Sequence, residues 1–115
     1  MTPHLTPVVQ AAGLAFVSGQ LAFDDGGRIS GDIESQTALA LGHLRDRLGE
    51  SGLSLSDVVK VTVWLRRRED FGAFNDVYAR TFGGHKPARS TVVSDLVLED
   101  ALVEIEAVAA LDSAS

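Results

Sequence analysis

An eight-residue run with a two-residue period constrains the fold of this chain more than any other feature. The run covers residues 58–65, and all of its odd-numbered positions are apolar, while its even-numbered positions include Lys60 and Thr62. Alternation of this kind is typical of a β-strand, and β-branched residues favour that conformation. The sequence therefore predicts a sheet in which this strand has one apolar face.

Four further strands and two helices are expected around this run. The strands cover residues 8–12, 14–20, 89–95 and 102–110, with a short one at 28–30. The first helix begins near Asp32, a good N-cap residue, and ends before Gly52, while the second runs from about Glu69 to Phe82. The element order β-β-α-β-α-β-β predicts an α+β fold with both helices on one face of a sheet.

Each expected helix has a stripe of residues at helical spacing that we assign to the core. In the first helix the stripe is Ile33, Thr37, Ala40, Leu41, Leu44 and Leu48. In the second helix it is Phe71, Phe74, Tyr78 and Phe82. We interpret this aromatic stripe as core packing rather than as a stacking platform.

Length and composition exclude several classes of protein. The 115 residues accommodate one domain, expected to span 1–115 with a frayed tail at 112–115. The absence of cysteine excludes disulfides, thiolate catalysis and cysteine-ligated metals. The net charge of −6 argues against nucleic-acid binding, and we interpret Arg66-Arg67-Arg68 as a solvated loop. No segment has the pattern of a signal peptide or a membrane span, so a cytoplasmic protein is expected.

The last expected strand has apolar residues on both faces. Val103, Ile105, Ala107 and Ala109 can face the helices, but Leu102 and Val108 point the opposite way, together with Glu104 and Glu106. Trp64 on the neighbouring strand adds to this second face. A solvated face seldom carries such side chains, so we infer an oligomer.

Arg89 and Glu104 are the main candidates for chemistry. Arg89 opens a strand after Lys86-Pro87-Ala88, and Glu104 lies in mid-strand on the face away from the helices. A guanidinium binds a carboxylate with two parallel hydrogen bonds. A carboxylate in apolar surroundings has a raised pKa and can transfer protons near neutral pH. From the pattern alone, an ion pair between subunits is favoured over a catalytic pair.

The other candidates are weaker. His4, His43 and His85 lack the spacing of a metal site, so no metal is expected. Ser18 lacks the glycine pattern that surrounds a serine nucleophile. Asn75 is either a surface residue or an amide that holds a neighbouring loop.

Six motifs, taken in chain order, resemble those of the reactive intermediate deaminase family, called Rid or YjgF-type and formerly the endoribonuclease L-PSP family. The matching stretches are Phe16-Val17-Ser18-Gly19-Gln20, residues 31–37, residues 57–63, residues 70–78, Pro87-Ala88-Arg89-Ser90 and Val103-Glu104-Ile105-Glu106-Ala107. They cover nearly the whole chain. The resemblance implies a fold like that of Bacillus-type chorismate mutase, with a mixed sheet. It also implies a homotrimer whose sheets form a central barrel, with clefts between subunits and no cofactor.

The resemblance also implies roles for individual residues. Arg89 would bind the carboxylate of a 2-imino acid or its enamine tautomer, and Glu104 would assist water or proton transfer. Asn75 would line or support the cleft, and the backbone near Ala88 and Ser18 would border it. The expected function is hydrolytic deamination of 2-imino acids to 2-keto acids and ammonia.

Two departures from the family pattern identify a divergent member. Leu5 occupies the place of a tyrosine that reaches into the cleft, and Thr91 stands where many members have cysteine. His4 lies next to Leu5 and could substitute for the missing hydroxyl. The alternatives that remain open are a non-catalytic module that binds small carboxylates and, with less support from the charge, a ribonuclease.

Overall fold

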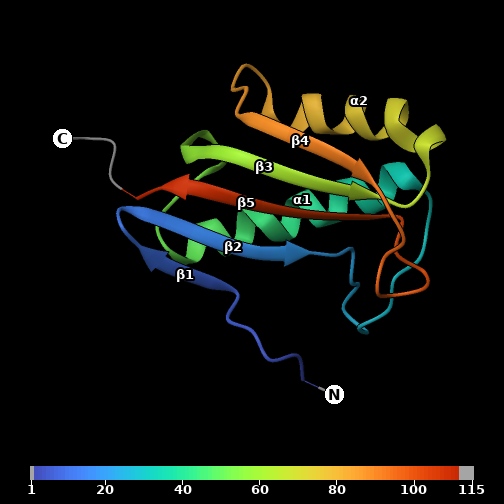
Figure 1. The fold of residues 1–115 in the computed structure, drawn as a ribbon, viewed down its shortest axis with the longest axis horizontal. Helices are drawn as coiled ribbons and strands as arrows, with labels where there is room; N and C mark the ends of the chain where they lie inside the picture. Colours follow the sequence, from blue (N-terminus) through green and yellow to red (C-terminus); the bar gives the residue numbers. More distant parts are fainter. Residues whose placement is uncertain (1, 112–115) are drawn as a thin grey trace.

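A five-stranded mixed sheet with two helices against one face forms the fold (Figure 1). The computed structural model describes residues 2–111, so the tail expected to fray lies outside the described residues. The strands are β1 (Val8–Ala11), β2 (Leu14–Gln20), β3 (Val58–Leu65), β4 (Ala88–Val93) and β5 (Val103–Ala110). They lie in the order β1-β2-β5-β3-β4, and only the β3–β4 pair is parallel. The predicted α+β class and element order are confirmed.

The helices are α1 (Ile33–Glu50) and α2 (Phe71–Phe82). The side chain of Asp32 caps α1 by accepting a hydrogen bond from the backbone N–H of Ser35 at 2.9 Å. Gly52, with φ +74°, follows the end of this helix in the left-handed region that glycine tolerates best. Short 3₁₀ turns precede β3 (Leu55–Asp57) and α2 (Arg68–Asp70), so α2 itself begins two residues later than expected.

The core lies between the helices and one face of the sheet. The residues expected on this face of β5 are all buried, as are Val61, Val63 and Leu65 of β3. The alternation in β3 breaks at its start, where Val58 is buried and Val59 is exposed. The cause is a register shift against β5 between Val58 and Lys60. The stripe expected on α1 is also buried throughout.

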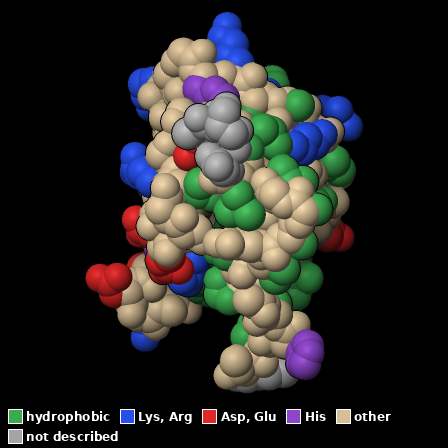
Figure 2. All heavy atoms as spheres, turned by 90° about the vertical axis from the view of Figure 1, so that its left-hand side faces the viewer, with side chains coloured by type: hydrophobic (Ala, Val, Ile, Leu, Met, Phe, Trp, Pro, Cys, Tyr) green, Lys and Arg blue, Asp and Glu red, His purple; other side chains and the backbone are tan. Residues whose placement is uncertain are grey.

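The opposite face of the sheet, which we call the open face, carries apolar side chains that are exposed (Val9, Phe16, Val92) or half-buried (Trp64, Val108). Val9, Phe16 and Val108 follow one another across β1, β2 and β5, and Trp64 pairs with Val92 across β3 and β4. Figure 2, viewed from the left-hand side of Figure 1, shows hydrophobic side chains gathered along one side of the molecule. The expectation of an apolar second face therefore holds, while the oligomer inferred from it stays a prediction.

Three expectations about loops and burial are wrong in detail. Phe71 is 43% exposed and lies outside the buried stripe of α2, because the stripe begins one turn later at Phe74. Residues 28–30 form a single bridge between Phe23 and Ile29 rather than a strand. Arg66 is not a solvated loop residue, since its guanidinium donates hydrogen bonds to three backbone carbonyls. The acceptors are Leu96 O at 3.2 Å, Leu98 O at 2.8 Å and Ala101 O at 2.7 Å.

Gln36 is a buried polar residue that fastens α1 to the segment before β5. Its amide nitrogen donates to Gly31 O at 3.2 Å and Asp100 O at 3.1 Å, and its amide oxygen accepts from Leu102 N at 2.9 Å. A buried hydrogen bond adds little net stability to the folded state. Removing one of its two partners, however, destabilises the folded state, because the remaining polar group is left without a hydrogen bond.

Replacing Gln36 with leucine is expected to lower the free energy of unfolding by about 3 kcal/mol, because three part-buried hydrogen bonds to backbone groups are lost together. Chemical denaturation measures this change. The matched control is Gln10→Leu, at an exposed position on β1, for which a change within about 0.5 kcal/mol is expected. Equal stability of the two variants would contradict the assigned role.

Among the described residues, no helix combines the length and the hydropathy needed to span a bilayer.

Candidate active site

Arg89 lies on an aromatic platform formed by α2. Its position opposite Val61 in the parallel β3–β4 pair directs its side chain to the face that carries the helices. The guanidinium carbon lies 4.6 Å from the ring centroid of Tyr78, 5.5 Å from that of Phe74 and 5.7 Å from that of Phe71. Attraction between a cation and aromatic rings at such distances holds the guanidinium in place. The aromatic stripe is thus both core packing and a stacking platform for Arg89, which corrects the interpretation as packing alone.

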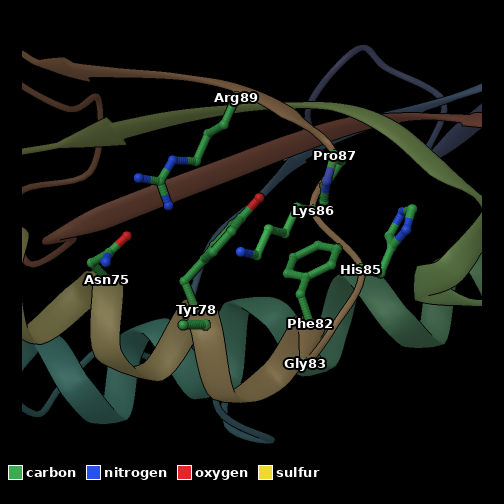
Figure 3. A pocket seen from close by; sticks show the side chains of 9 residues that line it. Asn75, Tyr78, Phe82, Gly83, His85, Lys86, Pro87 and Arg89 are labelled. Atoms are coloured by element: carbon green, nitrogen blue, oxygen red, sulfur yellow. The ribbon is translucent and has the colours of Figure 1, made fainter.

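A pocket of about 400 Å³ opens between α2 and the start of β4 (Figure 3). Arg89 and Asn75 both line it, so the structure brings these two predicted site residues together. Its other polar lining residues are Tyr78, His85 and Lys86. A ring nitrogen of His85 is already engaged with Val58 O at 2.7 Å. Thr91 follows Arg89 on the same face of β4, because it pairs with the buried Val63.

Glu104 lies on the opposite face of the sheet from Arg89. It pairs with Trp64, whose side chain points to the open face. Burial raises the pKa of the Glu104 carboxyl, and the neighbouring charge of Glu106 raises it further. A smaller hollow of about 220 Å³ beside it is lined by Trp64, Glu104 and residues 94–97. A carboxyl with a raised pKa is suited to exchange protons near neutral pH.

One copy of the chain therefore holds two separate parts of the predicted site. Arg89, Asn75 and Thr91 lie with the helices, whereas Glu104 lies on the open face. A sheet separates the two groups, so they cannot act on one small molecule within the same subunit. Contact between them requires the cleft between subunits that the resemblance implies.

The remaining predicted residues lie around β2 and at the two edges of the sheet. The hydroxyl of Ser18 donates to Thr6 O at 2.7 Å, so it anchors the N-terminal segment. Leu5 in that segment is 58% exposed, and His4 beside it is exposed too. Ala88 pairs with Lys60 at the far edge of the sheet. Leu5 and Ala88 thus flank opposite edges, as Figure 1 shows for β1 and β4.

Gly19 belongs to the Ser18-Gly19-Gln20 end of β2, which the resemblance implies borders the cleft, but sequence reasoning assigned the glycine no role of its own. A Cβ added at Gly19 would collide with a carboxylate oxygen of Glu104, so the glycine leaves room for that carboxylate. Its φ angle is not in the left-handed region, so this space rather than backbone freedom accounts for the glycine. The sequence signal for this position is the family motif Phe16-Val17-Ser18-Gly19-Gln20, which does not indicate the contact with Glu104.

Within the described part of the chain, no three histidine, aspartate or glutamate side chains gather in a way that could hold a metal ion.

The sequence model of the family "Endoribonuclease L-PSP" matches residues 2–111. The chain belongs to the endoribonuclease L-PSP family. A RutC family protein from Pyrococcus horikoshii is 42% identical over 103 residues, which cover 88% of this chain and 82% of that relative. Protein DfrA from Myxococcus xanthus is 37% identical over 103 residues, covering 88% of this chain and 79% of DfrA. The predicted resemblance is confirmed.

Crystal structures of L-PSP relatives share the whole fold. E. coli TdcF with bound serine matches with a TM-score of 0.89 at 31% identity, covering 96% of this chain and 90% of TdcF. YyfA from Yersinia pestis, described as a Rid family protein of unknown function, matches with a TM-score of 0.90 at 32% identity, covering 96% of this chain and 90% of YyfA.

In this L-PSP member, replacing Gly19 with alanine is expected to displace the Glu104 carboxylate and to lower kcat about tenfold or more for any reaction in which that carboxylate transfers protons. Gly49→Ala is the matched control, because a Cβ there meets nothing within 4 Å and the helix gains stability. Steady-state kinetics and thermal melting measure the two effects. Unchanged kinetics in Gly19→Ala would contradict the assigned role of the glycine.

Proposed function

We propose that this protein hydrolyses reactive 2-imino acids and their enamine tautomers to 2-keto acids and ammonia. The observation that carries the proposal is Arg89, a guanidinium held on three aromatic rings beside a pocket, with no ion-pair partner among residues 2–111. Such a group presents its hydrogen-bond donors to a carboxylate. Its match to the arginine of the family motif and the serine bound to TdcF support a small amino-acid-like ligand.

The reaction needs only positioning and proton transfer. Arg89 holds the substrate carboxylate, and the oxygen of a water molecule adds to the imine carbon while the C=N electron pair moves to nitrogen. Glu104 accepts a proton from the water and returns one to nitrogen. The hydroxyl proton of the carbinolamine then passes to nitrogen through the same carboxylate, so that the C–N bond breaks, ammonia leaves and the C=O bond forms. A carboxyl whose pKa is raised exchanges protons more readily in both directions near neutral pH than an ordinary glutamate does.

We propose that the complete site forms between two copies in a homotrimer. Arg89 and Asn75 of one subunit would face Glu104 of the next, which accounts for their positions on opposite faces of one sheet. The exposed apolar side chains of the open face supply the surface that such an assembly buries.

An imine-trapping assay tests the proposed reaction. An amino-acid oxidase generates the imine, and semicarbazide captures whatever imine remains. Addition of this protein is expected to lower the rate at which the imine forms semicarbazone, and a higher protein concentration is expected to lower that rate further. An unchanged rate with imines of small, acidic and aromatic amino acids would contradict the proposal.

A carboxylate-binding module without turnover is the second candidate, and Leu5 favours it. The side chain at this position is exposed and has no hydroxyl to assist the reaction. In that case 2-keto acids bind and raise the melting temperature, but trapping rates do not change.

A further inference from the structure

The pocket beside Arg89 contains a second cation. Lys86 lines the same cavity, and among residues 2–111 neither cation forms an ion pair. The lining contains no aspartate or glutamate. In a chain of net charge −6, two unpaired cations around one cavity without a carboxylate form a local site for anions.

Tyr78 adds a hydrogen-bond donor without an acceptor. The residue is 7% exposed, and its hydroxyl is buried with no hydrogen-bond partner among the described residues. In Figure 3 the Tyr78 ring rises from α2 between the guanidinium of Arg89 on one side and the ammonium of Lys86 on the other. A buried hydroxyl without a partner has a free-energy cost, which an acceptor oxygen brought by a ligand would offset.

From this lining we infer that the protein prefers substrates with two carboxylates: 2-imino acids derived from acidic amino acids. Arg89 binds the carboxylate next to the imine carbon, and Lys86 binds the carboxylate at the end of the substrate side chain, with the Tyr78 hydroxyl between them. The inference rests on the proposed function for the identity of the reaction. It goes further by naming the substrate class and Lys86 as the residue that selects it.

The geometry favours a dicarboxylate over a single compact anion such as phosphate. Arg89 and Lys86 stand three residues apart in the chain, so their backbones are separated by at most roughly 10 Å. The planar guanidinium suits one carboxylate, while the flexible ammonium acts as a point charge for a second group at variable distance.

Binding of the stable 2-keto acid products tests the inference without any turnover. Calorimetric titration compares 2-oxoglutarate, 2-oxobutanoate and inorganic phosphate on the full chain. The wild-type protein is expected to bind 2-oxoglutarate about five- to tenfold more tightly than 2-oxobutanoate, the gain of one additional charge-assisted contact at an exposed lysine. Lys86→Met is expected to remove this preference and to leave binding of 2-oxobutanoate unchanged.

Arg80→Met is the matched control, since Arg80 is an exposed cation on α2 outside the pocket lining. It is expected to retain the preference. Equal affinities in the wild type, no binding of either keto acid, or a preference that survives Lys86→Met would each overturn the inference. Phosphate binding as tight as that of 2-oxoglutarate and equally dependent on Lys86 would also overturn it, because the pocket would then be a general anion site.

The same variants separate this inference from the proposed reaction. A preference for 2-oxoglutarate without any effect on imine trapping would support the dicarboxylate site and contradict the deaminase. Faster hydrolysis of the imine of an acidic amino acid, lost in Lys86→Met while hydrolysis of a small neutral imine persists, would support both.

Discussion

Replacing Arg89 with alanine is expected to lower kcat/KM for imine hydrolysis about 100-fold or more. Truncation of one partner in a hydrogen-bonded charge pair typically costs 2–5 kcal/mol, and about 1.4 kcal/mol corresponds to a factor of ten. The trapping assay under limiting substrate measures this loss. Arg89→Lys is expected to fall between the wild type and Arg89→Ala, because lysine keeps the charge but loses the planar pair of donors.

The control for this prediction is Arg80→Ala, which removes an exposed cation from the neighbouring helix and leaves the charge of the pocket intact. Arg89 also contacts three rings of the platform, so thermal melting must accompany the kinetics to separate loss of binding from loss of folding. A folded Arg89→Ala variant with full activity would show that the carboxylate is held elsewhere.

The second large effect is recovery of activity when two inactive variants are mixed. Arg89→Ala and Glu104→Gln are each expected to be inactive. Co-expressed chains, however, form interfaces in which an intact Arg89 of one copy meets an intact Glu104 of another. Random assembly of equal amounts in a closed ring gives an intact pair at about a quarter of the interfaces. Recovery of about a quarter of wild-type activity is therefore expected, measured on the co-purified mixture.

The matched control combines both substitutions in one chain and co-expresses it with the wild type. That mixture has the same overall number of altered residues, and the same random assembly also leaves about a quarter of its interfaces intact. The decisive comparison is thus with each single variant alone. A mixture of single variants as inactive as its components would contradict a site shared between subunits.

Local patterns predicted most of the fold. The alternation in residues 58–65 and 102–110 and the stripe on α1 identified the two central strands and the helix that covers them, and the structure confirms all three. The position of Gln36 in the sequence is consistent with burial, because it lies three residues after Ile33 and four before Ala40, within the apolar stripe of the helix. Its partners in the segment before β5 are 64 and 66 residues away, which no local pattern can indicate.

The faces of the site residues depend on long-range register. Alternation placed Glu104 away from the helices, but the face of Arg89 follows from its pairing with Val61 across a parallel crossover. The loop interpretation of Arg66 failed for the same reason, because its carbonyl acceptors come from residues 96–101. Charge and flanking residues alone do not distinguish a solvated arginine from one that organises a distant loop. The roles assigned to Arg89, Glu104 and Asn75 remain predictions.

If the site is shared between subunits as proposed, the placement of Arg89 and Glu104 on opposite faces makes activity depend on assembly as well as on folding. A newly synthesised chain would then gain a working site only when it encounters another copy. At low abundance the catalytic capacity of such a protein rises more steeply than in proportion to the number of chains, since encounter follows mass action. The rate of imine removal would then increase with the number of gene copies more steeply than in direct proportion.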